Sequence, residues 1–235
     1  MESKLPPGQR AVEAFHRFGL TPFAKRFPRQ THSRSLEVCG HVQQVLQLQD
    51  VFEGLERAEV QSDFHCVTTW SVRSLRWEGV RFSDLYWQVL HPQARHDPDA
   101  TLVAMRGQDG ARTALPLEDL LAPEVLLADR LNGEPLTMDH GAPLRLVVPG
   151  HYGYKSMKYL CRLEFRRPQE GYAVSGLRFM DHPRARVALE ERGRALPGWL
   201  LRWLYRPLIA STVATFARAA TGPAPLNSGA GEGQR

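Results

Sequence analysis

The chain has 235 residues, 43% of them hydrophobic and 23% charged, which suits one large folded domain or one domain with an appendage. Its net charge of +5 permits an anionic ligand, nucleic acid or an acidic membrane as partner but selects none of them. The three cysteines lie far apart without a C-x-x-C pair, which argues against a disulfide-stapled scaffold and against a zinc or redox pair.

The N-terminal residues 1–34 contain neither an apolar run nor a twin-arginine pair, so the sequence predicts no export signal and a cytoplasmic protein. We expect these residues to form an extension before the main domain, 35–195. Within that domain, short runs rich in Val, Leu and aromatics, bounded by Gly, Pro or Asp, predict strands. These runs are SLEVCGHV (35–42), DFHCVTTWS (63–71), ATLVAM (100–105), PLRLVVPG (143–150) and KYLCRLEF (158–165).

Short helices are expected between the strands. Ser83 is placed as the N-cap of a helix within 81–90, and Pro116 as the opening of a single helical turn within 115–121. Residues 91–100 and 130–143 carry Pro, Gly, Asn and Asp at the density of loops. The pattern predicts an α+β fold with mixed β-sheets and short covering helices.

The C-terminal residues 196–220 are apolar around most of a helical circumference. Arg202, Arg206 and Pro207 interrupt them, and no run reaches the roughly 20 residues that a bilayer span needs. Two interpretations stay open: a pair of helices packed back onto the domain, or a docking surface for a membrane or a redox partner. Residues 221–235 are rich in Gly, Pro and Ala and predict a disordered tail.

Cys66 lies in a strand-like run with His65 beside it and no second cysteine nearby, so it is either a small buried hydrophobe or a metal thiolate. Further along the chain, MDHGAPLRLVVPGHYGYKSMKYL (138–160) gathers basic residues around three glycines and two prolines. Glycines let a backbone approach a ligand closely, and Arg and Lys donate charged hydrogen bonds to anions. This loop is therefore a candidate phosphate or anion site.

The two segments together, HCVTTWS followed by LRWEGV and then DHGAPLRLVVPGHYGYKSMKYL, resemble the molybdopterin-binding domain of the sulfite oxidase family. The likeness extends from about Leu36 to Phe165. The first motif, C-V-x-x-W-S, is most similar to the bacterial branch that includes the catalytic subunit of protein-methionine-sulfoxide reductase.

The resemblance implies a molybdenum-molybdopterin cofactor whose metal is bound by the sulfur of Cys66. A soft thiolate matches a metal that is already bound by the dithiolene sulfurs of the pterin. The resemblance further assigns the pterin and its anionic end to His140, Arg145, Lys155, Ser156, Met157 and Lys158. It places His65 and Trp70 near the metal, where they shape the site without ligating it.

The function implied is two-electron oxygen-atom transfer on a small substrate, a sulfoxide, an N-oxide or a sulfite-like anion, with electrons exchanged with a separate haem or flavin protein. Sulfite oxidases carry an arginine pair where this chain has Thr69 and Trp70, so we expect a neutral oxide to be a better substrate than sulfite. Arg73 and Arg76 are close enough in sequence to restore that charge.

The N-terminal pterin contact of the bacterial reductase has no recognisable counterpart in this sequence. His16, Arg17 and Arg26 are the candidates to replace it. Other classes of function stay open: a non-catalytic pterin- or anion-binding module, such as a cofactor carrier, and a nucleic-acid binder. The last is disfavoured, and no nucleic-acid partner is expected, because the aromatic and basic residues form no known nucleic-acid motif or shared stripe.

Overall fold

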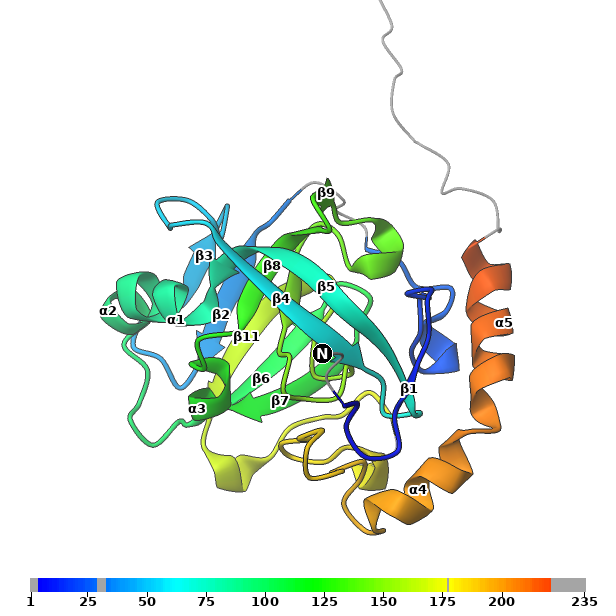
Figure 1. Cartoon of the computed structure of the whole chain (residues 1–235). Helices are drawn as coiled ribbons and strands as arrows, with labels where there is room; N and C mark the ends of the chain where they lie inside the picture. The colour runs from blue at the N-terminus through cyan, green and yellow to red at the C-terminus, as the bar shows by residue number, and fades with distance from the viewer. Residues whose placement is uncertain (1–3, 29–32, 177, 221–235) are drawn as a thin grey trace, which may run out of the picture.

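Two mixed β-sheets make up the body of the protein in the computed structural model, which describes residues 4–28, 33–176 and 178–220 (Figure 1). The first sheet has the order β1–β5–β8–β10, with β4 paired to β5 and β9 to β8. Its strands are β1 (Arg10–Ala11), β4 (Ala58–His65), β5 (Trp70–Arg81), β8 (Leu126–Leu131), β9 (Glu134–Pro135) and β10 (Arg145–Val147).

The second sheet has the order β3–β2–β11–β6–β7. Its strands are β3 (Leu46–Leu48), β2 (Leu36–Gly40), β11 (Leu160–Arg166), β6 (Leu102–Gly107) and β7 (Arg112–Pro116). Each sheet contains one parallel pair, β1 with β5 and β2 with β11, and the remaining neighbours are antiparallel. The predicted α+β class with mixed sheets is confirmed.

The first sheet is covered on both faces. Because side chains alternate along a strand, Leu127 of β8 packs into the core between the two sheets, whereas its neighbour Leu126 faces the opposite side. On that opposite side, Phe15 and Phe18 of the N-terminal segment and Ile209 of the C-terminal region pack against the sheet. The terminal segments therefore form an outer layer over the first sheet.

Helices fill the edges of the two sheets. One helical stretch after β5 consists of α1 (Phe82–Leu85), η2 (Tyr86–Leu90) and α2 (His91–Ala94). It begins two residues earlier than an N-cap at Ser83 would allow, because Arg81 is at the N-cap position, and it continues into the segment expected to be a loop. The apolar side chains of Leu85 and Leu90 drive this packing, since both are fully buried.

The remaining short elements are α3 (Leu117–Leu120), η1 (Thr21–Phe23), η3 (Met138–His140), η4 (Pro168–Glu170) and η5 (Arg178–Met180). Pro116 stands at the N-cap of α3, one position before the helical turn that it was expected to open. The loop predicted at 130–143 holds the end of β8, the short strand β9 and η3.

Four of the five predicted strand runs contain a strand of the structure, namely β2, β6, β10 and β11. The run DFHCVTTWS is not one strand: β4 ends at His65, β5 begins at Trp70, and the residues between them form a turn. The amide of Thr69 donates to the carbonyl oxygen of Cys66 over 3.1 Å, and Thr69 adopts a positive φ of 83°. Cys66 therefore lies at a hairpin turn, where its side chain can face a ligand.

The C-terminal residues form α4 (Gly198–Tyr205) and α5 (Leu208–Ala220), which run along one edge of the molecule (Figure 1). Leu201, Tyr205 and Phe216 are buried, so the helices pack back onto the body, as the first of the two interpretations expects. In the described ranges, no helix has the length and apolarity to cross a membrane. The tail expected at 221–235 lies outside the described residues.

Candidate functional site

A cavity of about 450 Å³ lies between the outer face of the first sheet and the terminal segments. Seven of the nine predicted site residues line it: Cys66, Trp70, His140, Arg145, Ser156, Met157 and Lys158. The sequence motifs, far apart in the chain, thus meet at one place because the β4–β5 turn and the loop before β11 lie against the same face of the sheet.

The turn that carries Cys66 is held from three sides. The side-chain amide of Gln9 donates to the Cys66 carbonyl oxygen over 3.1 Å, and the Cys66 amide donates to the Trp70 carbonyl oxygen over 2.8 Å. The fully buried guanidinium of Arg192 donates to the carbonyl oxygens of Val67 and, over 3.1 Å, of Pro7. These contacts fix the position of the cysteine sulfur.

The thiol of Cys66 is buried, and its Sγ lies 3.2 Å from the Thr68 hydroxyl oxygen. Burial raises the pKa of Cys66, while the hydrogen bond from Thr68 acts in the opposite direction and is the smaller effect. A thiol with a raised pKa stays protonated near neutral pH unless a metal displaces the proton. The environment suits a metal ligand better than a free nucleophile.

Arg145 is a buried cation in the lining of the cavity, with 3% of its surface exposed. Its Nη1 donates to the His140 carbonyl oxygen over 2.8 Å, its Nε has no hydrogen-bond partner, and its guanidinium lies 5.0 Å from the Phe64 ring centroid. Burial lowers the pKa of Arg145 to about 9. No carboxylate among the described residues forms an ion pair with it, and such a buried charge is costly unless a ligand compensates it.

Lys158 lies beside Arg145 and has only weak partners. Its Nζ is 3.4 Å from the Phe18 carbonyl oxygen and 3.5 Å from that of Asp139. Burial, followed by repulsion from Arg145 and Arg17, lowers the pKa of Lys158 to about 7. Like charges that repel one another around a cavity are stabilised when an anion binds between them.

Close packing at Lys158 explains one glycine of the loop. A Cβ on Gly141 would lie 3.0 Å from the Lys158 Cγ, and its φ of +107° disfavours any other residue. Gly141 therefore lets the chain turn tightly against the lysine stem.

Arg17 is the third cation, and it comes from the N-terminal segment. Its guanidinium donates to the carbonyl oxygens of Ala24 over 2.7 Å and Arg26 over 2.9 Å, and it lies 4.0 Å from the Phe27 ring centroid. Its Nε is 3.8 Å from an Asp139 carboxylate oxygen. Of the three N-terminal candidates, His16 and Arg17 line the cavity, whereas the lining does not include Arg26.

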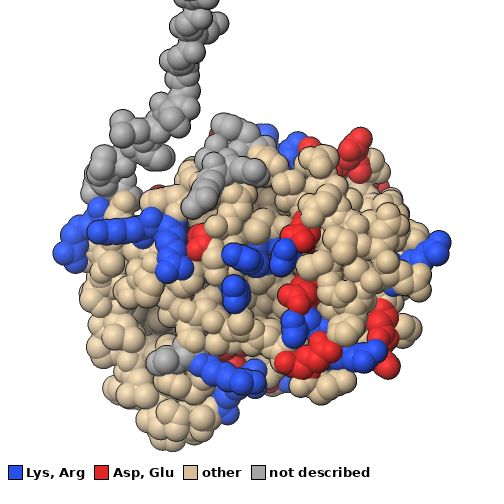
Figure 2. All heavy atoms as spheres, turned by 180° about the vertical axis from the view of Figure 1, so that it is seen from behind, with Lys and Arg blue, Asp and Glu red and all other residues tan. Residues whose placement is uncertain are grey.

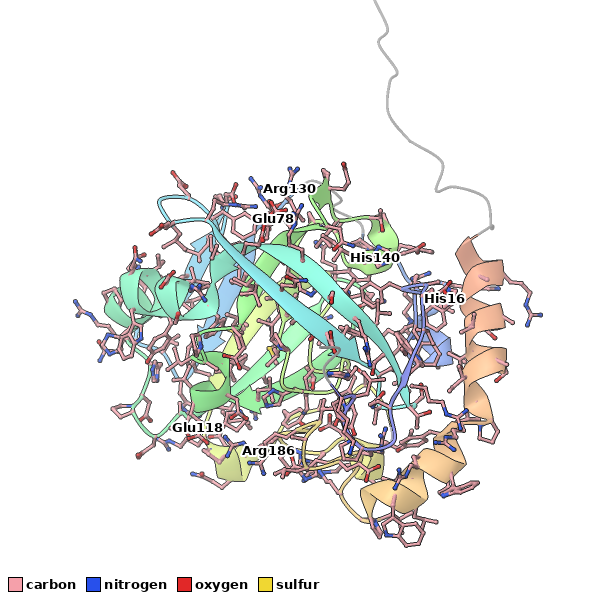
Figure 3. All side chains as sticks on the ribbon, in the orientation of Figure 1. His16, Glu78, Glu118, Arg130, His140 and Arg186 are labelled. Carbon is pink, nitrogen blue, oxygen red and sulfur yellow. The ribbon has the colours of Figure 1, made fainter. Side chains whose placement is uncertain are left out.

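His140 joins the loop to the N-terminal segment (Figure 3). Burial lowers its pKa, so the ring is neutral: Nε2 donates to the Phe15 carbonyl oxygen over 2.9 Å, and Nδ1 accepts from the Thr137 hydroxyl over 2.9 Å. The ring also stacks on Phe15, with centroids 4.8 Å apart. Both ring nitrogens are thus engaged, and a hydrogen bond to a pterin requires one of these contacts to break.

Two predicted site residues, Lys155 and His65, are not among the residues that line the cavity. Lys155 is fully buried behind the loop, where Nζ donates to the Ala114 carbonyl oxygen over 2.9 Å and lies 3.4 Å from an Asp181 carboxylate oxygen. His65 lies at the end of β4, with Nδ1 2.8 Å from the Ser71 hydroxyl oxygen. Both side chains contact the protein around the cavity, so they remain candidates for positioning the site and not for direct contact with a ligand in the cavity.

Much of the apolar wall was not identified from the sequence. It comes from Phe15 and Phe18 of the N-terminal segment and from Leu208, Thr212 and Phe216 of α5. Phe18 and Phe216 stack with ring centroids 6.5 Å apart and planes 8° apart. The only sequence signal for this wall was the apolar character of residues 196–220.

The arrangement suits a metal held by one protein ligand together with an anionic organic group. Within residues 4–28, 33–176 and 178–220, no cluster of three or more His, Cys, Asp or Glu side chains could hold a metal ion. Cys66 supplies one thiolate, and the uncompensated guanidinium of Arg145 lies beside Lys158 and Arg17. The residues present fit a cofactor that brings its own metal ligands and a phosphate.

Comparisons with known proteins agree with this geometry. The family model described as "Oxidoreductase molybdopterin binding domain" matches residues 24–173. The "Uncharacterized oxidoreductase YuiH" of Bacillus subtilis (strain 168) is 36% identical over 168 residues, which cover 70% of this chain and 80% of that protein.

Two further relatives have named activities. Mitochondrial sulfite oxidase of Homo sapiens is 32% identical over 63% of this chain and 26% of its own length. The protein-methionine-sulfoxide reductase catalytic subunit MsrP of Xanthomonas campestris is 29% identical over 67% of this chain and 56% of its own length. The chain thus spans about a quarter of the one and about half of the other. On the match of residues 24–173, it belongs to the family of oxidoreductases with a molybdopterin-binding domain, of which sulfite oxidase is a member.

Proposed function

We propose that this oxidoreductase transfers an oxygen atom to or from a small neutral substrate, such as a sulfoxide or an N-oxide, in a two-electron reaction. The family's cofactor is molybdenum-molybdopterin. The observation that carries the proposal is the shared cavity, in which the Cys66 thiol faces three cations, Arg17, Arg145 and Lys158.

The residues of the chain divide the work of holding the cofactor. Cys66 would bind the metal as a thiolate, and its proton would leave on loading because burial keeps the empty thiol protonated. Arg145, Lys158 and Arg17 would pair with the anionic end, while Ser156 and Met157 line the cavity between the two ends. When bound, the cofactor supplies a metal that changes its oxidation state by two electrons and exchanges an oxo group.

A neutral substrate is favoured by the wall next to Cys66, which consists of Phe64, Thr68 and Trp70. Arg76 points away from it, with Nε 3.5 Å from a Glu59 carboxylate oxygen, and the lining formed by the described residues includes neither Arg76 nor Arg73. Of the four Arg and Lys side chains that line the cavity, Arg17, Arg145 and Lys158 are assigned to the cofactor, and the fourth, Arg112, is exposed to solvent at the start of β7. A doubly charged anion near the metal would lack fixed partners of its own, which is costly in a buried site.

We further propose that electrons are exchanged with a separate haem or flavin protein and that the enzyme works in the cytoplasm. The family model matches residues 24–173, and described segments outside that range, among them the N-terminal segment, α4 and α5, contribute to the same cavity wall. These segments are therefore accounted for as parts of one site.

Steady-state kinetics with an artificial electron donor test the proposal. We expect turnover of a sulfoxide or N-oxide with kcat/KM at least about tenfold above that for sulfite oxidation, because the buried wall lacks cations for the anion. Cys66→Ser should abolish turnover and change the metal's absorption spectrum while the pterin stays bound through its anionic end.

Two outcomes contradict parts of this function. Efficient sulfite oxidation would refute the neutral-substrate argument. A fully loaded protein without turnover of any of these substrates, and with an unchanged spectrum in Cys66→Ser, would favour a non-catalytic cofactor carrier.

A further inference from the structure

Helix α4 turns large apolar side chains toward solvent. Leu201 and Tyr205 are buried against the body, whereas the opposite face is open. We call the exposed side chains on and beside this face the α4 patch: Leu196 (40% exposed), Trp199 (55%), Trp203 (65%), Leu204 (55%) and Leu208 (49%). Trp199 and Trp203 are four residues apart and share one side of the helix.

Arginines predominate in the segment that carries the patch, with Glu190 next to Arg202. Residues 192–220 contain five arginines and no Asp or Glu, which equals the +5 net charge of the whole chain, so the rest of the sequence is balanced with 25 basic and 25 acidic residues. The guanidinium carbon of Arg206 lies 5.6 Å from the Trp203 ring centroid, and Arg202 is 3.4 Å from a Glu190 carboxylate oxygen. The patch thus combines indole rings with cations.

The position of α4 and the chemistry of its exposed side chains favour a lipid surface as partner. Helix α4 lies at the outer edge (Figure 1), and in the reverse view it belongs to a largely uncharged lobe at the lower left (Figure 2). Tryptophan combines a large apolar ring with a polar N–H, which suits the boundary between lipid headgroups and acyl chains. Arginines beside such rings add attraction to anionic headgroups.

We propose that the α4 patch binds the surface of an anionic lipid bilayer, with the helix lying in the interface and Trp199 and Trp203 at headgroup level. Tyr205 and Leu208 line the cavity wall, so the docked face adjoins the site. Binding to the bilayer depends on the surface of α4 and not on the cofactor. It can therefore be tested independently of the proposed reaction.

Co-sedimentation of the full-length protein with vesicles tests this proposal. We expect binding to vesicles of phosphatidylcholine with phosphatidylglycerol, weaker binding to phosphatidylcholine alone, and loss of affinity as salt rises. The double variant Trp199→Ser/Trp203→Ser should lower the affinity by at least about tenfold, since two buried apolar contacts are removed.

The matched control is Trp87→Ser. Trp87 is 57% exposed, a value similar to that of Trp199, but it lies on η2, at the opposite edge of the molecule from α4. This variant should bind vesicles as the unmodified protein does, and unchanged thermal unfolding should show that both variants are folded.

Three results would overturn the proposal: no vesicle binding by the unmodified protein, equal loss with Trp87→Ser, or unchanged binding by the double variant. A shift from dimer to monomer in the double variant, without vesicle binding in either protein, would assign the patch to a second copy of the chain instead.

Discussion

Two regions, the loop from Thr137 to Tyr159 and the terminal segments, line the same cavity with different kinds of side chain. The loop from Thr137 to Tyr159 contributes Arg145 and Lys158. Its strand β10 pairs with β8, and within the loop the Leu146 amide donates to the Met157 carbonyl oxygen over 2.9 Å. The terminal segments contribute mainly apolar cover. The comparison indicates that the loop provides binding charge on a rigid support, whereas the terminal segments determine how well the bound group is enclosed.

The N-terminal segment is joined both to the first sheet, through the pairing of β1 with β5, and to the loop. The N-terminal segment contacts the loop through the Phe15 carbonyl oxygen, at 2.9 Å from His140 Nε2, and the Phe18 carbonyl oxygen, at 3.4 Å from Lys158 Nζ. The following predictions test whether charge and enclosure are separable in this way.

The largest effect is expected for Arg145→Met, which keeps an apolar stem but removes the buried cation. The affinity for the cofactor should fall by about 10- to 150-fold, because a charged hydrogen bond worth about 1.5–3 kcal/mol is lost. The cofactor occupancy of the purified protein should fall with it. Thermal unfolding of the cofactor-free protein should change little, because the guanidinium has no carboxylate partner among the described residues. Pterin fluorescence after denaturation measures the occupancy.

Lys155→Met is the control within the same loop. It leaves Asp181 buried without its cation, so stability should fall while the folded fraction keeps its cofactor. If Lys155→Met lost the cofactor and Arg145→Met kept it, the division of the loop into a cavity wall and a scaffold would be wrong.

An intermediate effect is expected for Arg17→Met. The guanidinium ties the residues after it together through the carbonyl oxygens of Phe23, Ala24 and Arg26. Its loss should expose residues 18–28 to limited proteolysis and lower cofactor affinity by about 5- to 10-fold, less than Arg145→Met. Limited proteolysis followed by mass spectrometry measures the exposure of residues 18–28. If this segment stays resistant and the cofactor occupancy is unchanged, Arg17 does not contribute to the site.

A smaller effect is expected for Phe216→Leu on α5. Phe216 is 3% exposed and stacks on Phe18, so the shorter side chain should cost at most about 1.5 kcal/mol. We expect the cofactor to be released about two- to fivefold faster. The contacts of Arg145 and Lys158 with the cofactor should stay intact. Release that is unchanged, measured by dilution into an apo-protein acceptor, would contradict the role of α5 as cover.

The smallest effect concerns pH and Lys158. Its pKa of about 7 lies below the ordinary value of 10.5 because of burial and the nearby Arg145 and Arg17, partly offset by Asp109 and Asp139. Its buried charge therefore costs most stability below pH 7, and cofactor-free protein should become more stable as pH rises above 7. Sulfate, which does not titrate in this range, should bind more weakly at pH 8 than at pH 6.

Lys158→Arg should flatten this dependence between pH 6 and 8, since arginine keeps its charge. Thermal shifts with and without sulfate provide the measurement. An equally steep dependence in the variant would show that another group titrates.

The site residues that could be predicted from the sequence were those concentrated in short segments. Cys66 and the residues of the 138–160 loop lie within two runs of the chain, and the fold brings most of them to one cavity. The sequence did not reveal which way single side chains point: Lys155 is buried against Ala114 and Asp181, and the turn between β4 and β5 was taken for a continuous strand.

The rest of the site depends on contacts between distant parts of the chain. Phe18 and Phe216 are almost 200 residues apart, and their stacking has no local sequence pattern. The domain boundaries at 34, 195 and 220 remain predictions, although both terminal segments pack on the body. Sequence periodicity predicts that α4 and α5 are helical, but which of their faces covers the cavity is decided only by tertiary packing.

The most direct test of the central claim is the metal and pterin content of the full-length protein produced in a host that makes molybdenum cofactor. Elemental analysis combined with pterin fluorescence should give about one molybdenum and one pterin per chain, because the cavity offers one thiolate and one cluster of cations. Protein from the same host that is folded but free of molybdenum and pterin would contradict the assignment of this cavity as the cofactor site.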